Sequence, residues 1–97
     1  MTTTKLYLII CPNYDREKLK DFLTESQIIS DWFYNMKDTL FIKSTLSAQE
    51  IGQKIRSKFG DQTYFITSVS SNYWGILPGD HWKKFDPLVP KLKPKTF

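Results

Sequence analysis

The most informative stretch of the sequence is Leu46–Ile51, which reads LSAQEI. Ser47 and Glu50 have the spacing of a capping box, in which the Ser47 hydroxyl accepts from the Glu50 N–H and the Glu50 carboxylate accepts from the Ser47 N–H. Leu46 before the box and Ile51 after it are placed to form a hydrophobic staple. The stretch therefore predicts that a helix begins here.

The residues that follow define the rest of this helix. Ile51, Ile55 and Phe59 recur every four residues, which places them on one face of a helix. Gly60 comes next and suits a C-terminal cap, because glycine adopts left-handed backbone conformations at little cost. We expect a helix that buries the isoleucine face and ends near Gly60.

A β-hairpin is predicted immediately before this helix. Polar and apolar residues alternate over Ile28–Met36, and Thr39–Thr45 is the second apolar, β-branched run. Lys37 and Asp38 form the short turn between them, although the Asn-Gly pair of the strongest hairpin turns is absent. The two runs therefore predict paired antiparallel strands.

The first third of the chain predicts a strand and a helix. Lys5–Cys11 is rich in Leu and Ile on both faces, as in a strand buried on both sides. Pro12 ends this strand, because proline has no N–H to donate to a neighbour. Asn13 or Asp15 can then cap a helix within Tyr14–Ser26.

A final apolar run, Thr63–Ser71, completes the order β-α-β-β-α-β. This order predicts an α+β, ferredoxin-like sandwich with a four-stranded antiparallel sheet and two helices on one face. The second face then has no cover within the chain and needs a partner or a ligand. Residues 1–85 form the domain, in which Asn72–Gly79 could add one short C-terminal strand, and residues 86–97 form a tail rich in Pro and Lys.

The net charge of +4 lies entirely at the C-terminal end. Residues 1–80 contain nine basic and nine acidic residues, whereas residues 81–97 contain five lysines and one acid. A neutral body attracts phosphates weakly, so we expect any grip on nucleic acid to come from the tail. The candidate nucleic-acid-binding residues are Lys83, Lys84, Lys91, Lys93 and Lys95.

Three stretches carry a resemblance to a known family. The segment Asp31–Ser44 (DWFYNMKDTLFIKS), the helix start Ser47–Ile51 (SAQEI) and the ending Trp74–Pro78 (WGILP) resemble the small CRISPR-associated endoribonuclease-like superfamily. This is the family of the second CRISPR core protein and its non-CRISPR relatives. The resemblance implies a ferredoxin-like homodimer with its sheets face to face and C-terminal segments reaching the partner. It also implies a bacterial or mobile-element origin.

The chain departs from that family at the metal site. Active members carry an aspartate at the end of the first strand, and one from each subunit holds a divalent metal. Here the strand ends in Cys11, Pro12 and Asn13, so the resemblance implies that nuclease activity is missing. Under the nuclease alternative, Asp15 and Asp31 are the weak catalytic candidates and Mg²⁺ is the cofactor. Otherwise we expect no cofactor and no metal.

Other candidate residues have plainer explanations. Cys11 lies in a predicted buried strand, where thiols are usually inert, and the single histidine, His81, lies in a polar turn. Aromatic side chains are enriched at subunit contacts, so Trp32, Tyr34 and Trp74 are predicted at a dimer interface. One cysteine and no long apolar run predict a cytoplasmic protein without a membrane partner.

These observations favour a non-catalytic homodimeric protein that binds nucleic acid or a partner protein, in a bacterial defence or mobile-element context. Two alternatives stay open. One is a metal-dependent nuclease of the CRISPR-associated type. The other is a small-ligand regulatory domain that uses aromatic residues on its open sheet face as a stacking surface.

Overall fold

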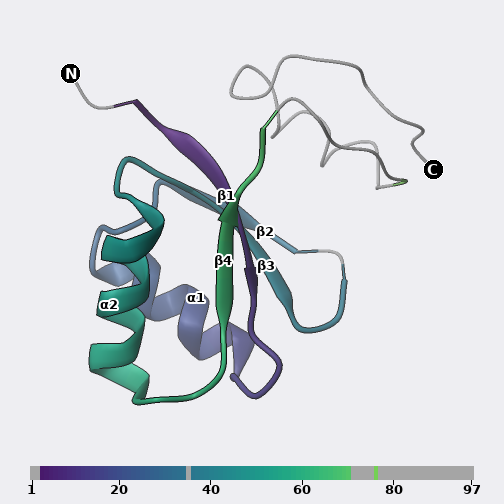
Figure 1. The fold of residues 1–97 in the computed structure, drawn as a ribbon, viewed down its shortest axis with the longest axis vertical. Helices are drawn as coiled ribbons and strands as arrows, with labels where there is room; N and C mark the ends of the chain where they lie inside the picture. The colour runs from purple at the N-terminus through teal and green to yellow at the C-terminus, as the bar shows by residue number, and fades with distance from the viewer. Residues whose placement is uncertain (1–2, 35, 71–75, 77–97) are drawn as a thin grey trace.

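Six helices and strands follow one another in the computed structural model, which describes residues 3–34, 36–70 and 76. In chain order they are β1 (Lys5–Ile10), α1 (Arg16–Glu25), β2 (Asp31–Phe33), β3 (Thr39–Ser44), α2 (Ala48–Phe59) and β4 (Phe65–Ser68). The four strands form one antiparallel sheet, and the helices pack beside it (Figure 1). The predicted α+β class, with a four-stranded antiparallel sheet and two helices, is confirmed.

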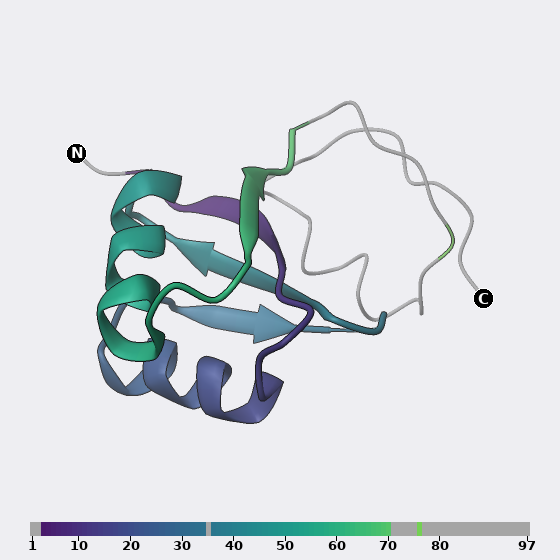
Figure 2. The same ribbon diagram turned by 60° about the horizontal axis from the view of Figure 1, so that its bottom comes forward.

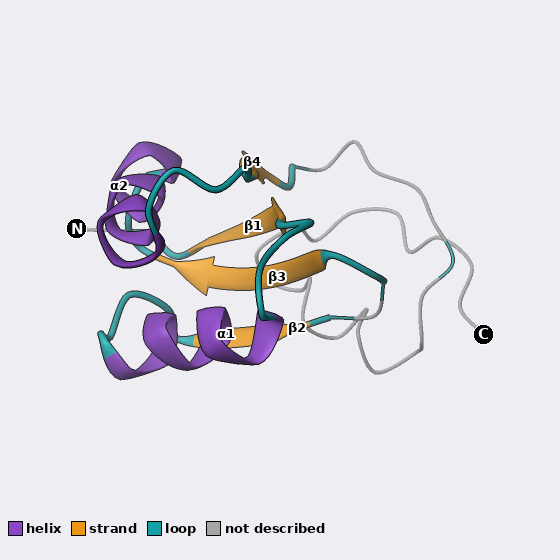
Figure 3. Ribbon diagram, turned by 90° about the horizontal axis from the view of Figure 1, so that it is seen from below, coloured by secondary structure: helices purple, strands orange, loops and turns teal. Residues whose placement is uncertain are grey.

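The strands lie in the order β2-β3-β1-β4, so β1 and β3 are central and β2 and β4 are the edges. In the register of β1 with β3, Tyr7 lies opposite Ile42 and Ile9 opposite Leu40. Side chains alternate between faces along a strand, so these four share one face. Figures 2 and 3 show the sheet with both helices against that face.

The core lies between this face and the helices. Tyr7, Ile9, Leu40 and Ile42 from the sheet belong to the same buried cluster as apolar residues from both helices. The helix members are Leu19, Leu23, Ile51 and Ile55, all fully buried. The predicted isoleucine face of α2 is therefore confirmed. The helix predicted within Tyr14–Ser26 is α1, which buries its two leucines.

The helix starts follow the predicted chemistry. Ser47 and Glu50 form the capping box, with the Glu50 N–H donating to Ser47 Oγ at 3.1 Å and the Ser47 N–H donating to Glu50 Oε1 at 3.0 Å. Asp15, rather than Asn13, caps α1. Its side chain accepts hydrogen bonds from the N–H groups of Glu17 and Lys18. Gly60 follows α2 with φ of +82°, in the left-handed region that favours glycine.

Two predicted strands are longer than the observed ones. The hairpin strand predicted over Ile28–Met36 is β2, of only three residues. Its first part is bound to α1 instead, because the N–H groups of Ile28 and Ile29 both donate to the Leu23 carbonyl, at 3.0 and 3.4 Å. The strand predicted over Thr63–Ser71 is β4, from Phe65 to Ser68.

β1 is also buried less evenly than expected. Leu6, on the face away from the helices, is buried, but Ile10 on that same face is 42% exposed. The face toward the helices is buried at Tyr7 and Ile9, and the burial of the other face varies along the strand.

The remaining expectations about architecture concern the C-terminal end. The aromatic stretch Asn72–Gly79 and the tail 86–97 lie outside the described residues, apart from Ile76. In the part of the chain that the structure describes, neither helix has the length and apolar character needed to span a membrane.

A glycine inside α2 makes a close contact that the sequence does not explain. A Cβ on Gly52 would lie 2.7 Å from the Tyr64 hydroxyl oxygen and 3.2 and 3.3 Å from two ring carbons. At a helix position without such a contact, replacing glycine by alanine raises the free energy of unfolding by about 1 kcal/mol. The Tyr64 side chain would therefore have to shift to accommodate any larger residue at position 52.

We expect Gly52→Ala to lower the free energy of unfolding by roughly 1 kcal/mol, since overpacking of about 1–3 kcal/mol outweighs the gain in helix propensity. In a Tyr64→Ala background, where the ring is gone, the same substitution is expected to raise that free energy by up to about 1 kcal/mol. Urea unfolding of the four proteins measures both effects. A change of the same sign in both backgrounds would contradict the contact.

Candidate functional site

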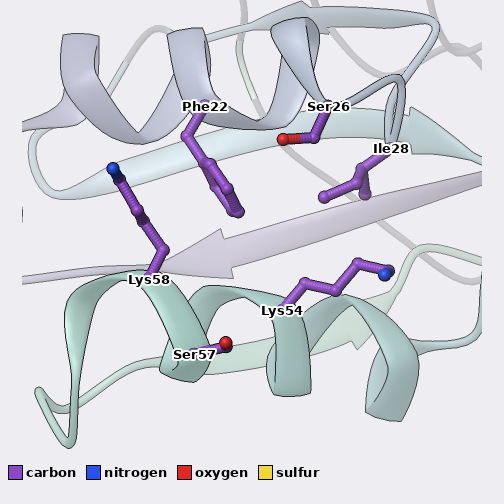
Figure 4. Close-up of a pocket in the computed structure, with 6 residues that line it drawn as sticks. All are labelled: Phe22, Ser26, Ile28, Lys54, Ser57 and Lys58. Carbon is purple, nitrogen blue, oxygen red and sulfur yellow. The ribbon is translucent and has the colours of Figure 1, made fainter.

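A hollow of about 370 Å³ lies between α1 and α2, on the helix side of the sheet (Figure 4). It is lined by two lysines, two serines and two apolar residues. They are Phe22, Ser26, Ile28, Lys54, Ser57 and Lys58.

The α1 wall of the hollow is apolar at its centre. Leu19 and Leu23 point into the core and leave Phe22, on the neighbouring flank of α1, only half-buried. The Phe22 ring packs edge-on against Phe59 of α2, with centroids 5.7 Å apart and planes at 89°. Figure 4 shows the Phe22 side chain pointing from α1 toward α2. This contact gives the hollow an aromatic wall that is held in place.

The α2 wall carries the positive charge. Ile51 and Ile55 point into the core, and Lys54 and Lys58, one turn apart, lie on the flank that faces α1. Within residues 3–34 and 36–70, no carboxylate oxygen lies within 4.0 Å of either ammonium group. Two like charges one turn apart repel each other, so an anion placed between them is favoured.

The C-terminal end of α1 lies beside the hollow, because Ser26, which follows the helix, is one of the lining residues. The last carbonyls of a helix are normally unsatisfied and partly negative. Here the Phe22 carbonyl accepts from the Ser26 N–H at 3.0 Å, and the Leu23 carbonyl accepts from the Ile28 N–H at 3.0 Å. Thr24 also accepts, from the Gln27 N–H at 3.1 Å. These bonds give three carbonyls near the end of α1 an N–H partner each.

A second hollow, of about 320 Å³, adjoins the first and shares Phe22 and Lys58 with it. Its other lining residues are Lys18, Asp21, Glu25 and Phe59. Carboxylates and ammonium groups are therefore mixed there. The lining of the first hollow has two lysines and no acid, whereas the lining of the second has two lysines and two acids.

The predicted interface residues Trp32 and Tyr34 lie on the helix side of the sheet. Trp32 is opposite Ile42, and both aromatic side chains pack against the core cluster. Their rings stack with centroids 5.6 Å apart. Arg16 lies 3.7 Å from the centre of the Tyr34 ring, and Lys20 lies 4.7 Å from that of Trp32. Cations from α1 therefore face both rings.

A hydrogen bond completes this aromatic cluster. The Tyr34 hydroxyl donates to Glu17 Oε1 at 2.6 Å. This bond lowers the pKa of the Glu17 carboxyl and raises the pKa of Tyr34. The Lys20 ammonium group also lowers the pKa of Glu17. The cluster thus ties β2 to α1. Trp74, the third predicted interface residue, lies outside the described part of the chain.

The two aspartates proposed for a nuclease are not brought together. Asp15 caps α1 at the end near the β2–β3 turn, since the neighbouring Arg16 donates to the Met36 and Thr39 carbonyls at 2.7 and 3.1 Å. Asp31 begins β2 at that strand's other end. Among residues 3–34 and 36–70, no group of three His, Cys, Asp or Glu side chains is arranged to hold a metal.

Asp31 has its own local contacts. Its Oδ1 accepts from the Trp32 N–H at 2.8 Å, and its Oδ2 lies 4.0 Å from the Lys43 ammonium group. Asp31 and Lys43 are opposite each other in register, on the face away from the helices. Asp31 therefore contributes to the pairing of β2 with β3.

Cys11 is buried, as predicted, with 1% of its surface exposed. Its Sγ donates to the Asp38 carbonyl at 3.5 Å. Burial raises the pKa of the thiol, partly offset by the nearby Arg16. A neutral, buried thiol is a poor nucleophile. His81 and the five tail lysines lie outside the described residues.

The hollow between the helices was not predicted from the sequence. The available signal was the spacing of Lys54 and Lys58, which places both on one flank of α2. Nothing in that spacing indicates that Phe22 and Ser26 lie opposite.

No protein-family description matches this chain, and no curated protein or solved structure matches it.

Proposed function

We propose that this chain is a non-catalytic binding domain with a ferredoxin-like fold, and that the hollow between α1 and α2 takes a small ligand that carries a phosphate group. The fold proposal is supported by the element order β-α-β-β-α-β and by both helices lying on one face. It is also supported by the sheet order, which counted from the opposite edge runs β4-β1-β3-β2.

The lining of the hollow is the observation that carries the ligand proposal. Lys54 and Lys58 supply ammonium donors, Ser26 and Ser57 supply hydroxyl donors, and no lining residue is acidic. A phosphate presents three or more acceptor oxygens with negative charge, so these groups complement it. The half-buried Phe22 ring offers a surface for an apolar or aromatic part of the same molecule.

Size and charge both favour a small ligand over a long polyanion. About 370 Å³ lies within the range of roughly 300–1,000 Å³ for small-molecule sites. A nucleic-acid strand that continued past Lys58 would enter the neighbouring hollow, where Asp21 and Glu25 offset the charges of Lys18 and Lys58 and leave no net attraction for phosphates. A mononucleotide has the required size, one charged end and one aromatic end. A small ligand is therefore better supported than a long polyanion, but at the hollow between the helices and not on the open sheet face, where the sequence had placed it.

Three further properties predicted from the sequence are a homodimer, nucleic-acid binding by the tail and metal-dependent nuclease activity. The homodimer is part of the proposal, and the tail lysines remain candidates for binding nucleic acid. The metal-dependent nuclease has less support, because Asp15 already accepts two backbone N–H groups and Asp31 lies at the opposite end of β2 beside Lys43.

Titration with adenosine monophosphate, adenosine and inorganic phosphate, followed by amide chemical shifts, tests the ligand proposal. We expect saturable shifts at Phe22, Ser26 and Ser57, with the monophosphate binding more tightly than either part alone. Lys54→Gln and Lys58→Gln are each expected to weaken it roughly tenfold, as for the loss of one charged contact. Lys37→Gln, an exposed lysine in the β2–β3 turn, is the matched control and should change little.

Three results would each count against the site. They are an unchanged affinity in the Lys54→Gln/Lys58→Gln double variant, adenosine binding as tightly as its monophosphate, and no saturable shift with any of the three probes.

A further inference from the structure

β4 is an edge strand without the features that usually protect an edge. Its sequence is FITS, with no charged residue and no proline, and three of its four residues are exposed. Natural edge strands are typically blocked by lysines, prolines or bulges, because their free backbone groups pair readily with another strand. Within residues 3–34 and 36–70, no strand pairs with the outer side of β4.

The backbone orientation of β4 follows from one hydrogen bond. The Val69 N–H donates to the Leu6 carbonyl at 2.8 Å, which continues the β1–β4 ladder by one residue. Alternate residues of an antiparallel strand face the same neighbour, so Phe65 and Thr67 also face β1. The N–H and C=O groups of Ile66 and Ser68 point outward.

These outward-pointing backbone groups have few hydrogen-bond partners within the described part of the chain. The Ser68 carbonyl accepts only a long bond of 3.4 Å from the Thr67 hydroxyl, and a carbonyl can accept a second bond. They are positioned to form a further ladder.

Apolar side chains are exposed along the same edge. Phe65 is 62% exposed and lies opposite Ile10, which is 42% exposed, on the face away from the helices. Pairing along β4 would bring another strand beside Phe65 and cover part of this surface.

We propose that β4 pairs antiparallel with β4 of a second copy, so that two sheets join edge to edge. This inference rests on the proposed homodimer and replaces contact between sheet faces with contact between strand edges. A strand that pairs with its own copy about a two-fold axis is self-complementary by construction.

The register follows from the direction of the backbone groups. Residues whose backbone N–H and C=O groups point outward must pair with residues of the same kind in the second copy. The two-fold axis therefore lies between one residue and the same residue of the second copy, and not between two neighbouring residues of the strand. Placing it at Thr67 pairs the whole ladder from Phe65 to Val69. Ile66 then lies opposite Ser68 of the second copy, and Phe65 lies opposite Val69. Thr67 lies opposite itself, in a non-hydrogen-bonded pair.

Disulfide cross-linking tests this register directly. Cα atoms of a non-hydrogen-bonded pair are about 4.5 Å apart, which lies within disulfide range. We expect Thr67→Cys to form a covalent dimer under mild oxidation, at least tenfold faster than Ser68→Cys, as seen on a non-reducing gel. The wild type supplies the control, because its one cysteine, Cys11, is buried and should not cross-link.

A charge variant separates this proposal from the homodimer itself. Thr67→Lys places like charges opposite each other at the axis, while the exposed side chain leaves the folded chain intact. Light scattering should show a dimeric wild type and a monomeric variant with an unchanged circular dichroism spectrum. A dimer that survives Thr67→Lys and gives no Thr67→Cys cross-link would overturn edge pairing alone. A monomeric wild type at hundreds of micromolar would overturn both.

Discussion

Replacing Ile9 by alanine is expected to lower the free energy of unfolding by about 3–4 kcal/mol. Ile9 has no exposed surface and lies in the cluster that joins β1 to β3 and both helices. Ile→Ala at such sites costs about 2–5 kcal/mol, because the apolar contacts are lost and a cavity stays behind. The whole free energy of unfolding of a domain is roughly 5–15 kcal/mol, so the expected loss is a large share of it. Urea unfolding followed by circular dichroism measures it.

The neighbouring residue provides a matched control. Ile10→Ala removes the same atoms from the same strand and changes the same β-propensity, but Ile10 faces away from the helices and is 42% exposed. We expect less than half of the Ile9 effect. Equal losses at the two positions would show that the Ile10 side chain is packed as tightly as that of Ile9, contrary to its 42% exposure.

Replacing Ser44 by alanine is the second large effect, with an expected loss of about 2 kcal/mol. Ser44 ends β3 and is 1% exposed. Its hydroxyl donates to the Ile28 carbonyl at 2.6 Å and accepts from the Leu46 N–H at 3.1 Å. Alanine would leave a buried acceptor and donor without this partner, and each unsatisfied buried group costs about 1–3 kcal/mol.

A nearby serine isolates the effect of burial. Ser30 is exposed, and its hydroxyl makes only a 3.4 Å contact with the Lys43 carbonyl. Ser30→Ala is expected to change the free energy of unfolding by less than about 0.5 kcal/mol, as is usual for surface positions. If Ser44→Ala proved equally mild, water would have to replace the lost hydroxyl, and the bridge between the two loops would not be a stabilising feature.

The edge pairing of β4 and the hollow between the helices have separate tests, so either proposal can fail alone. The hollow is judged by ligand titration and its two lysines. The edge is judged by cross-linking at Thr67, which lies on β4 and does not line the hollow.

The local elements could be predicted from the sequence because their causes are local. The capping box at Ser47, the Asp15 cap and the isoleucine face of α2 all depend on residues within one or two turns of one another. Hydrogen-bond donors at a helix start must be satisfied close by, so a short stretch contains the whole argument. The same holds for Cys11, whose burial followed from the apolar run around it.

The tertiary structure alone decided which residues meet across the chain. The turn after α1 holds Ile28 and Ile29 on α1 and shortens β2 to three residues, so alternation in the sequence overestimated that strand. β2 also directs Trp32 and Tyr34 toward α1, where Lys20 and Arg16 face their rings. Alternation places residues on opposite faces without saying which face is covered.

The candidate site shows the same division. The LSAQEI stretch determined where α2 begins, and from that start the positions of Lys54 and Lys58 on one flank follow by helix geometry. What lies opposite that flank is set by how α1 and α2 pack on the sheet, over a separation of about thirty residues. Packing of buried faces fixes that placement, and it is what brings Phe22 and Ser26 to the lysines of a helix that the sequence alone had located.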